Sequence, residues 1–515
     1  MKTWRKHLLL LGIVLAFMGI LQFGWVNIAA AESKGVMKFA IHWNFSADWL
    51  DPASAGAQGS TGLLPLYFFH DSLLKMMSDG TTLSPCLAES WTVSSDFKVY
   101  EFKLRKGVKF HNGDIMTAED VIFSFWRYKS AQFKLLHGKT EKVEAVNPLQ
   151  VRISFKEAFP DFLNYFLAGV STIGWVVPKK YIEKVGVAGF KKHPIGCGPY
   201  KFVEFVPGVK LVGEAFEDYW RKVPNIKRLE YYNVGEGATR LAMVRRGEVD
   251  IATMMQGVYY EDVKKDPKLR MLEPVSPSQM LVFFTSQWDS KSPWSNARVR
   301  KAASLAIDRK TLADIHAPGC KGIGALGLES DPTLVKFPPD PYDPEGAKKL
   351  LAEAGYPKGF HGGTFYPYEG GYWAYGEQVA NYWKAVGITL DTKLLDRPAW
   401  FANRQGGKMK GATFIDPSPG PMVDERLSYL FRTGSYGNYP DIQALWGEFQ
   451  REIAPEARKN LLARIQKLIH ERTMWVPLTT LNVPSAIGPR VKGDPWRVQP
   501  LLWIPAPLED IELEK

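Results

Sequence analysis

Five side chains of the kinds that bind metal ions or transfer protons lie within ten residues of one another. They are His111, Asn112, Asp114, Glu119 and Asp120. A metal site would need the histidine and the carboxylates to point at one place, and a catalytic cluster would need an acid and a base within hydrogen-bond reach. Whether the sequence predicts either site depends on the elements that carry these residues.

Local patterns explain nearly every polar residue of this cluster as architecture. Residues 100–105 alternate apolar and charged side chains, which is the period of a half-buried strand. Asn112 and Gly113 form a pair that tolerates the backbone of a tight turn. Thr117 and Asp120 match a capping box, which predicts a helix with a buried face from residue 118 onward. His111 is therefore not predicted to be a ligand.

Other catalytic and metal-binding motifs are also missing from the sequence. It holds no G-x-S-x-G and no H-E-x-x-H motif, and Gly138-Lys139-Thr140 lacks the upstream glycine of a phosphate-binding loop. Cys86, Cys197 and Cys320 show no C-x-x-C spacing, and the sequence does not choose a disulfide pair among them. We predict no catalytic residue, no metal ligand and no cofactor. A secreted hydrolase of an unrecognised type stays open as the alternative class.

The N-terminus has the pattern of a secretory signal peptide. Three basic residues precede a mostly apolar run that ends in Ala29-Ala30-Ala31. We expect residues 1–31 to be a signal peptide that is cleaved after Ala31, with an uncleaved membrane anchor as the alternative. No cysteine near this exit could carry a lipid anchor. The expected location is the periplasm.

Charge and length limit the partners and the fold class. Removal of Lys2, Arg5 and Lys6 with the signal would lower the formal net charge from +11 to +8. The remaining basic residues alternate with acidic ones and form no long stripe that could follow a phosphate backbone, so nucleic acid is not an expected partner. A chain of 515 residues exceeds a single core. Strands alternate with helices, and no internal repeat is found, which indicates a multi-lobed α/β chain.

Five stretches match, in order and spacing, the blocks of one known family. They are "PCLAESWTVSSDFKVYEFKLRKGVKFHNGDIMTAEDVIFSF", "PIGCGPYKFVEFVPGVKLVGEAFEDYW", "ATRLAMVRRGEVDIA", "NARVRKAASLAIDRKTL" and "YDPEGAKKLLAEAGYPKGF". Together they resemble the family 5 extracellular solute-binding proteins, which are the oligopeptide-, dipeptide- and nickel-type receptors of ATP-driven importers. The region that resembles this family covers about residues 80–430.

The resemblance implies an α/β, two-lobed periplasmic binding protein fold, class II-like and of cluster C, with an extra third lobe. Lobe I would comprise residues 32–60, 190–280 and 485–515, the extra lobe residues 61–189, and lobe II residues 281–484. The implied function is that of a periplasmic receptor that delivers a solute, with a peptide as the first expectation, to the permease subunits of an ABC importer. The receptor would be a monomer and not an enzyme.

Three aromatic stretches are candidates for the walls of a ligand cleft: "HWNFSADWLDP", "TFYPYEGGYWAYGE" and "GATFIDPSPGP". The candidate ligand-binding residues are Trp43, Phe45, Trp49, Tyr366, Tyr368, Tyr372, Trp373 and Asp416. Apolar and aromatic walls with a few polar groups are typical of small-molecule sites. Core packing is the alternative for each ring, and it is the resemblance that places the three stretches at the cleft.

The identity of the ligand stays open at this point. Peptide receptors of the family often hold the ligand's α-ammonium with an aspartate, and Asp416 is the nearest candidate by resemblance. The residues around it depart from the usual pattern rich in Gly and Trp, and the second stretch holds no arginine that could receive a peptide carboxylate. Opines, oligosaccharides, glutathione-like compounds and metal chelates therefore stay alternatives to a peptide.

Overall fold

The structure is a computed structural model. It describes residues 33–55, 60–76, 83–128, 136–166, 174–273, 279–316, 319–327, 329, 331–367, 372–415, 423–432, 439–482, 484–493 and 507–514. The expected signal peptide at residues 1–31 lies outside the described residues. Among the described helices, none combines the length and the apolar character needed to cross a membrane.

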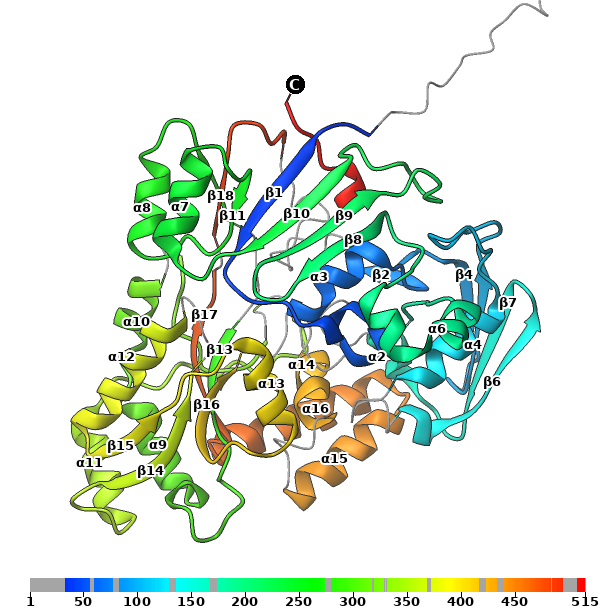
Figure 1. Ribbon diagram of the computed structural model, residues 1–515. Coiled ribbons are helices and arrows are strands. Elements are labelled where there is room, and N and C mark those ends of the chain that lie inside the picture. Colours follow the sequence, from blue (N-terminus) through cyan, green and yellow to red (C-terminus); the bar gives the residue numbers. More distant parts are fainter. Residues whose placement is uncertain are drawn as a thin grey trace, which may run out of the picture.

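A seven-stranded mixed sheet forms the upper part of the molecule in Figure 1, and we call this sheet with its helices lobe I. Its strands, in spatial order, are β12 (Arg270–Leu272), β18 (Ser485–Ile487), β11 (Ile251–Ala252), β1 (Val36–Ile41), β10 (Arg228–Asn233), β9 (Lys210–Ala215) and β8 (Tyr200–Val206). Its helices are η1 (Ala47–Leu50), α2 (Pro52–Ala55), α3 (Ser60–Phe69), α7 (Gly237–Arg245), α8 (Val258–Lys264) and η4 (Leu508–Asp510). Strand β1 runs parallel to both β10 and β11, so the carboxyl ends of these strands meet at one edge.

The extra lobe lies to the right of lobe I in Figure 1 and has a hydrophobic core of its own. Its four-stranded antiparallel sheet has the order β4 (Ala88–Val93), β5 (Val99–Leu104), β7 (Gln150–Phe155) and β6 (Thr140–Asn147). The other elements are the β2 (Leu74–Met76) and β3 (Leu83–Pro85) hairpin, α4 (Ala118–Arg127), η2 (Pro160–Phe166) and α6 (Lys179–Lys192). Both oxygens of the buried Asp51 carboxylate accept from the Arg127 guanidinium, at 3.1 and 2.8 Å, which fixes α4 to lobe I.

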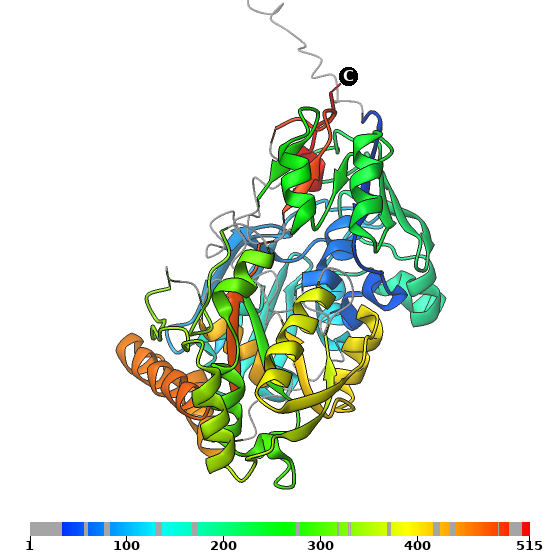
Figure 2. The ribbon, with the colours of Figure 1, turned by 90° about the vertical axis from the view of Figure 1, so that its left-hand side faces the viewer.

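A five-stranded sheet forms the lower tier in Figures 1 and 2, and we call it with its helices lobe II. Its strands, in spatial order, are β15 (Ile388–Thr392), β14 (Phe360–Tyr366), β16 (Gly411–Ile415), β13 (Gln279–Phe284) and β17 (Trp475–Thr480). Its helices are η3 (Pro293–Ser295), α9 (Ala297–Leu305), α10 (Arg309–His316), α11 (Pro344–Glu353), α12 (Tyr372–Ala385), α13 (Arg397–Gln405), α14 (Val423–Arg432), α15 (Pro440–Arg451) and α16 (Pro455–Glu471). All six residues of β13 are buried, as expected for a central strand with both faces covered.

Two chain crossings join lobe I to lobe II. The chain leaves lobe I after β12 and enters lobe II at β13, and it returns from β17 to β18. One continuous hydrophobic cluster runs through both lobes, with Phe39 of β1 and Phe283 of β13 among its members. The lobes are therefore in contact in this structure.

Candidate functional site

The predicted architecture of the cluster at residues 111–120 is confirmed. The backbone N–H of Gly196 donates to Nδ1 of His111 at 3.2 Å, so the ring proton is on Nε2, which donates to the Gly198 carbonyl at 3.0 Å. Burial lowers the pKa of His111 to about 3, so the ring is neutral. Thr117 and Asp120 form the capping box of α4. His111 therefore joins two segments of backbone and binds no ligand through either ring nitrogen.

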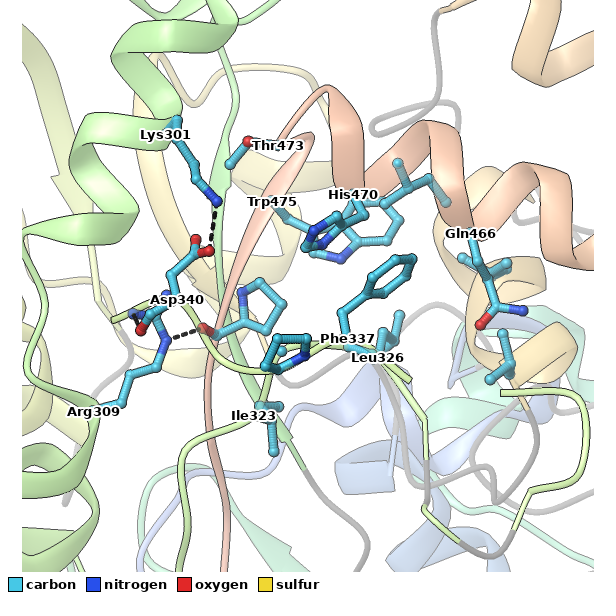
Figure 3. A pocket seen from close by; sticks show the side chains of 17 residues that line it. Lys301, Arg309, Ile323, Leu326, Phe337, Asp340, Gln466, His470, Thr473 and Trp475 are labelled. Atoms are coloured by element: carbon cyan, nitrogen blue, oxygen red, sulfur yellow. Dashed lines mark hydrogen bonds and ion pairs between the residues drawn. The ribbon is translucent and has the colours of Figure 1, made fainter. Parts of the chain in front are cut away.

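A cavity of about 40 Å³ inside lobe II is a packing feature, not a solute site (Figure 3). This volume holds only a few water molecules. Its charged groups are bonded within the protein: Lys301 Nζ lies 2.5 Å from Asp340 Oδ1, and the Arg309 guanidinium donates to the backbone carbonyl of Pro477 at 2.9 Å. The ring of His470 stacks on Phe337 with 3.9 Å between centroids. Elsewhere in the described residues, no three His, Cys, Asp or Glu side chains are arranged to hold a metal ion.

A more suitable site lies where strand ends of lobe I reach lobe II. Because β1 and β11 are parallel neighbours, His42 and Thr253 leave the sheet together, and His42 Nδ1 lies 3.1 Å from Thr253 Oγ1. The next residue, Met254, has a φ of 60°, a backbone conformation that non-glycine residues rarely adopt and that is often found at functional sites. In open α/β sheets, ligands bind outside the carboxyl ends of the strands. This edge of lobe I is therefore the candidate binding surface.

Lobe II presents its own strand ends and a helix start to this surface. Strands β14 and β16 are parallel, with Tyr366 paired to Thr413 near their carboxyl ends. Helix α13 begins at Arg397 because the carboxylate of Asp396 accepts from the Ala399 N–H at 2.7 Å, and proline follows within the first turn. The sequence thus places a cationic side chain at the first position of a helix that faces lobe I.

Arg397 lies between an aromatic ring of each lobe. Its guanidinium carbon is 5.9 Å from the ring centroid of Trp43 in lobe I and 5.8 Å from that of Tyr372 in lobe II. The Tyr372 ring is also 6.2 Å from that of His42. Only 5% of the Arg397 residue is exposed, and cation–π contacts strengthen when the cation is desolvated. Trp43, Tyr372 and Arg397 therefore form one constellation across the two lobes.

Two arginines make the surroundings of this constellation electropositive. The pKa of His42 is held well below 6.5, first by burial and then by the charges of Arg240 and Arg397, so His42 is neutral at physiological pH. Arg240 is part of the scaffold because its guanidinium donates to backbone carbonyls, including those of Thr253 at 2.8 Å and Met254 at 3.2 Å. The buried Arg397 side chain is a second cation, and it lies beside the rings of Trp43 and Tyr372.

The other predicted site residues differ in their surroundings. Phe45 and Trp49 are buried and continue from Trp43 into the core by edge-to-face contacts, with centroids 6.4 and 6.5 Å apart. Tyr366 is half-buried, and its carbonyl accepts from Trp400 Nε1 at 3.2 Å. Trp373 is half-buried on α12. Tyr368 and Asp416 lie outside the described residues, so the role of each stays a prediction.

Sequence reasoning missed His42 and Arg397. The stretch that carries Tyr372 holds no arginine, whereas Arg397 at the start of the next helix, α13, lies beside the Tyr372 ring. A signal was present, because Asp396 followed by Arg397 and proline has the pattern of a helix start. That pattern predicts a helix at this point but not which lobe the first side chain contacts.

The profile of the family "Bacterial extracellular solute-binding proteins, family 5 Middle" matches residues 82–438, which is more than half of the chain. The chain belongs to this family. The family 5 resemblance predicted from the sequence is thus confirmed. Members of the family bind small-molecule or peptide ligands and deliver them to the permease subunits of ABC importers. A periplasmic location of this family 5 receptor agrees with that of its relatives.

Two curated relatives and one solved structure extend this comparison. Heme-binding protein A of Haemophilus influenzae is 27% identical over 476 residues, covering 82% of this chain and 84% of that protein. Glutathione-binding protein GsiB of Escherichia coli is 27% identical over 524 residues, covering 95% and 96%. The periplasmic binding protein DppA of Helicobacter pylori, in complex with the peptide STSA, superposes with a TM-score of 0.82 at 22% identity, covering 93% and 98%. The predicted two-lobed periplasmic binding protein fold is thereby confirmed.

Proposed function

We propose that this family 5 receptor binds a small amino-acid-derived solute with a free carboxylate, with a short peptide as the first class and a glutathione-like compound as the second. The observation that carries the proposal is the position of Arg397, which is buried between Trp43 and Tyr372 where the lobes meet. The ligand is delivered to an ABC importer, as in the family. No chemical change of the ligand is part of this proposal.

The chemistry of Arg397 favours a carboxylate. A guanidinium presents its N–H donors in a planar fork that matches the two oxygens of a carboxylate, and such charge-assisted bonds are about twice as strong as neutral ones. The flanking rings exclude water and keep the effective dielectric low, which strengthens the pairing further. A neutral oligosaccharide would gain no ion pair from this charge, so the oligosaccharide alternative is the least supported.

The relatives are consistent with this ligand class. The glutathione of GsiB and the peptide STSA of DppA both carry free carboxylates. Opines and chelates built on amino acids share the same group, so they stay within the proposed class. What the observations support is therefore a carboxylate at Arg397, beside an aromatic ring of each lobe, while the remainder of the ligand is the quantity to be measured.

Closure of the lobes is the expected mechanism. A ligand shifts the equilibrium toward the closed arrangement only by the difference between its affinities for the closed and open arrangements. A carboxylate that reaches Arg397 gains its full stabilisation only when Trp43 of lobe I covers the charge. Binding energy at this point therefore drives closure.

Export and processing complete the proposal. The basic head, the apolar run and the Ala29-Ala30-Ala31 exit support cleavage after Ala31 and release without a lipid anchor. We propose the lobe ranges that the resemblance implies, namely 32–60, 190–280 and 485–515 for lobe I, 61–189 for the extra lobe and 281–484 for lobe II, with two changes. Helix α3 (Ser60–Phe69) joins lobe I because its buried side chains pack in the same cluster as β1, and the whole of β13 (Gln279–Phe284) joins lobe II.

Titration calorimetry with matched ligands tests the proposal. The panel consists of glutathione, the peptide Ser-Thr-Ser-Ala, the C-terminal amide of that peptide, and haem. We expect at least one ligand with a free carboxylate to bind. Amidation of the peptide's C-terminus and the substitution Arg397→Gln should each reduce the affinity about 30-fold or more. Lys393→Gln removes one exposed charge from the segment before α13 and is the control that keeps wild-type affinity. Equal affinity for the peptide and its amide would overturn the carboxylate assignment.

A further inference from the structure

The extra lobe contacts lobe II as well as lobe I. The helical turn η2 of the extra lobe lies against α15 of lobe II. In Figure 1, α15 is found below and to the left of the strands of the extra lobe. Asp161 of η2 forms an ion pair with Arg458 of α16. Beside it, Arg451 Nε of α15 lies 4.0 Å from Glu157 Oε2 of the extra lobe. Acidic side chains of one lobe thus meet basic side chains of the other.

Lobe II itself holds Arg458 in place. Its Nη1 donates to the carbonyls of Phe449 and Glu452, at 2.9 and 3.0 Å, and its guanidinium carbon lies 4.1 Å from the Phe449 ring centroid. These contacts leave Nη2 directed at the Asp161 carboxylate, to which it donates a hydrogen bond. The arginine is therefore pre-positioned for a partner outside its own lobe.

The Asp161–Arg458 pair is largely shielded from solvent, which strengthens the attraction between its two charges. The side chains of Arg458 and Asp161 are 17% and 12% exposed. Salt screens a pair at this depth less than a pair on the surface. Separation of the two lobes at this point breaks the pair and returns both charges to water, so the pair favours contact by its attraction less the hydration that the two groups regain.

We propose that the Asp161–Arg458 pair is a latch that stabilises the closed arrangement of lobe II on the extra lobe, even without ligand. The extra lobe moves with lobe I because the Asp51–Arg127 pair fixes it there. Lobe II is tied to that body by the two chain crossings, so opening of the cleft carries α16 away from η2. An ion pair made only in the closed arrangement shifts the equilibrium toward that arrangement by its own free energy.

The latch differs from the Arg397 constellation in what it controls. Arg397 acts on ligands that carry a carboxylate, whereas the latch changes the closed fraction of the receptor before any ligand arrives. Loss of the latch therefore weakens every ligand by the same factor. The inference rests on membership in a family of closing receptors and not on the proposed ligand class.

Measurements on the ligand-free receptor test the latch directly. The variants are Asp161→Asn, Arg458→Gln and their combination, and the control is Glu101→Gln, which breaks the 2.6 Å pair with Arg152 inside the extra lobe. We expect Asp161→Asn to enlarge the radius of gyration in small-angle X-ray scattering and to raise amide exchange at residues 160–166 and 455–460 by roughly tenfold. The double variant should open no further than Arg458→Gln, because that variant already lacks the pair together with the bonds from Arg458 to the Phe449 and Glu452 carbonyls.

The control and the salt dependence make the outcome decisive. Glu101→Gln should leave the radius and the exchange at 455–460 unchanged, and high salt should open the wild-type receptor less than Asp161→Asn does. An unchanged radius and unchanged exchange in Asp161→Asn would overturn the latch. The latch is also overturned if exchange rises only inside the extra lobe, because the aspartate then stabilises that lobe alone. Failure of the carboxylate assignment would leave these results untouched.

Discussion

The guanidinium carbon of Arg397 lies 5.9 Å from the ring centroid of Trp43. This relationship joins two lobes, because Trp43 follows the first strand of lobe I and Arg397 begins a helix of lobe II. The same contact brings a positive charge under an aromatic cover. If Arg397 binds a carboxylate as we propose, recognition of the anion and closure of the cleft are one event at this point of the molecule.

Replacement of Trp43 should weaken ligand binding according to how much of the ring is kept. Trp43→Phe retains an aromatic face over Arg397, whereas Trp43→Leu removes it, and a desolvated cation–π contact contributes about 1–2 kcal/mol. We expect about tenfold weaker binding of the best carboxylate ligand for Trp43→Leu and a smaller loss for Trp43→Phe, measured by calorimetry. Equal losses in the two variants would show that shape and not the ring face matters. Melting curves provide the folding control, because Trp43 is only 1% exposed.

The sequence predicts features whose partners are neighbours along the chain. The helix that begins after Asp343 has this residue as its cap, with the carboxylate accepting from the Gly346 N–H at 2.8 Å. It ends before Gly355, whose φ is 93°. The capping box at Thr117 follows the same logic. In each case a few adjacent residues determine the geometry, so the pattern and the structure agree.

The central contacts of the site depend on long-range arrangement and could not be predicted in this way. Trp43 meets Arg397 only because parallel strands in two separate sheets end at facing edges. Asp161 meets Arg458 only because the turn η2 of the extra lobe reaches helices α15 and α16 of lobe II. Neither pair has a spacing that a pattern could detect. The family resemblance predicted the lobes and placed Trp43 at the cleft, but it predicted neither Arg397 nor the Asp161–Arg458 pair.

Gly198→Ala should destabilise the receptor. A Cβ at Gly198 would lie 2.6 Å from the backbone nitrogen of His70, where no flexible side chain can yield. Overpacking of this kind costs about 1–3 kcal/mol of the free energy of unfolding. Urea unfolding at pH 7.5 measures the loss. Gly138→Ala is the matched control, because nothing lies within 4 Å of its added carbon, and a similar loss in both variants would contradict the packing argument.

Processing of the precursor should leave Glu32 as the first residue. Signal peptidases cut after small residues that follow an apolar run, and Ala31 meets this requirement. We expect osmotic shock to release the protein, with an intact mass that matches a chain from Glu32 to Lys515. Recovery of the chain with Met1 in the membrane fraction would instead establish an uncleaved anchor.

Stability should fall as the pH drops below about 6.5, and His111 should account for part of the fall. Burial lowers the pKa of His111 from 6.5 to about 3, so the folded protein keeps this ring neutral where the unfolded chain binds a proton. The stability it contributes is therefore complete above the unfolded pKa and is lost progressively as the pH falls toward 3. Burial also lowers the pKa of His70 to about 4, so protonation of His70 reduces the stability at low pH in the same way.

Replacement of one histidine separates this linkage from other acid effects. Each histidine adds a slope of about 1.4 kcal/mol per pH unit between its two pKa values, because the unfolded state binds one more proton there. His111→Gln removes the proton acceptor while its amide can still bond one of the Gly196 and Gly198 backbone groups. We expect a lower free energy of unfolding at pH 7.5 but a shallower decline between pH 6 and pH 4.5, measured by urea titration at each pH. An identical slope in the wild type and the variant would mean that the unfolded and folded states of His111 bind protons equally, which contradicts the buried neutral ring that joins Gly196 to Gly198.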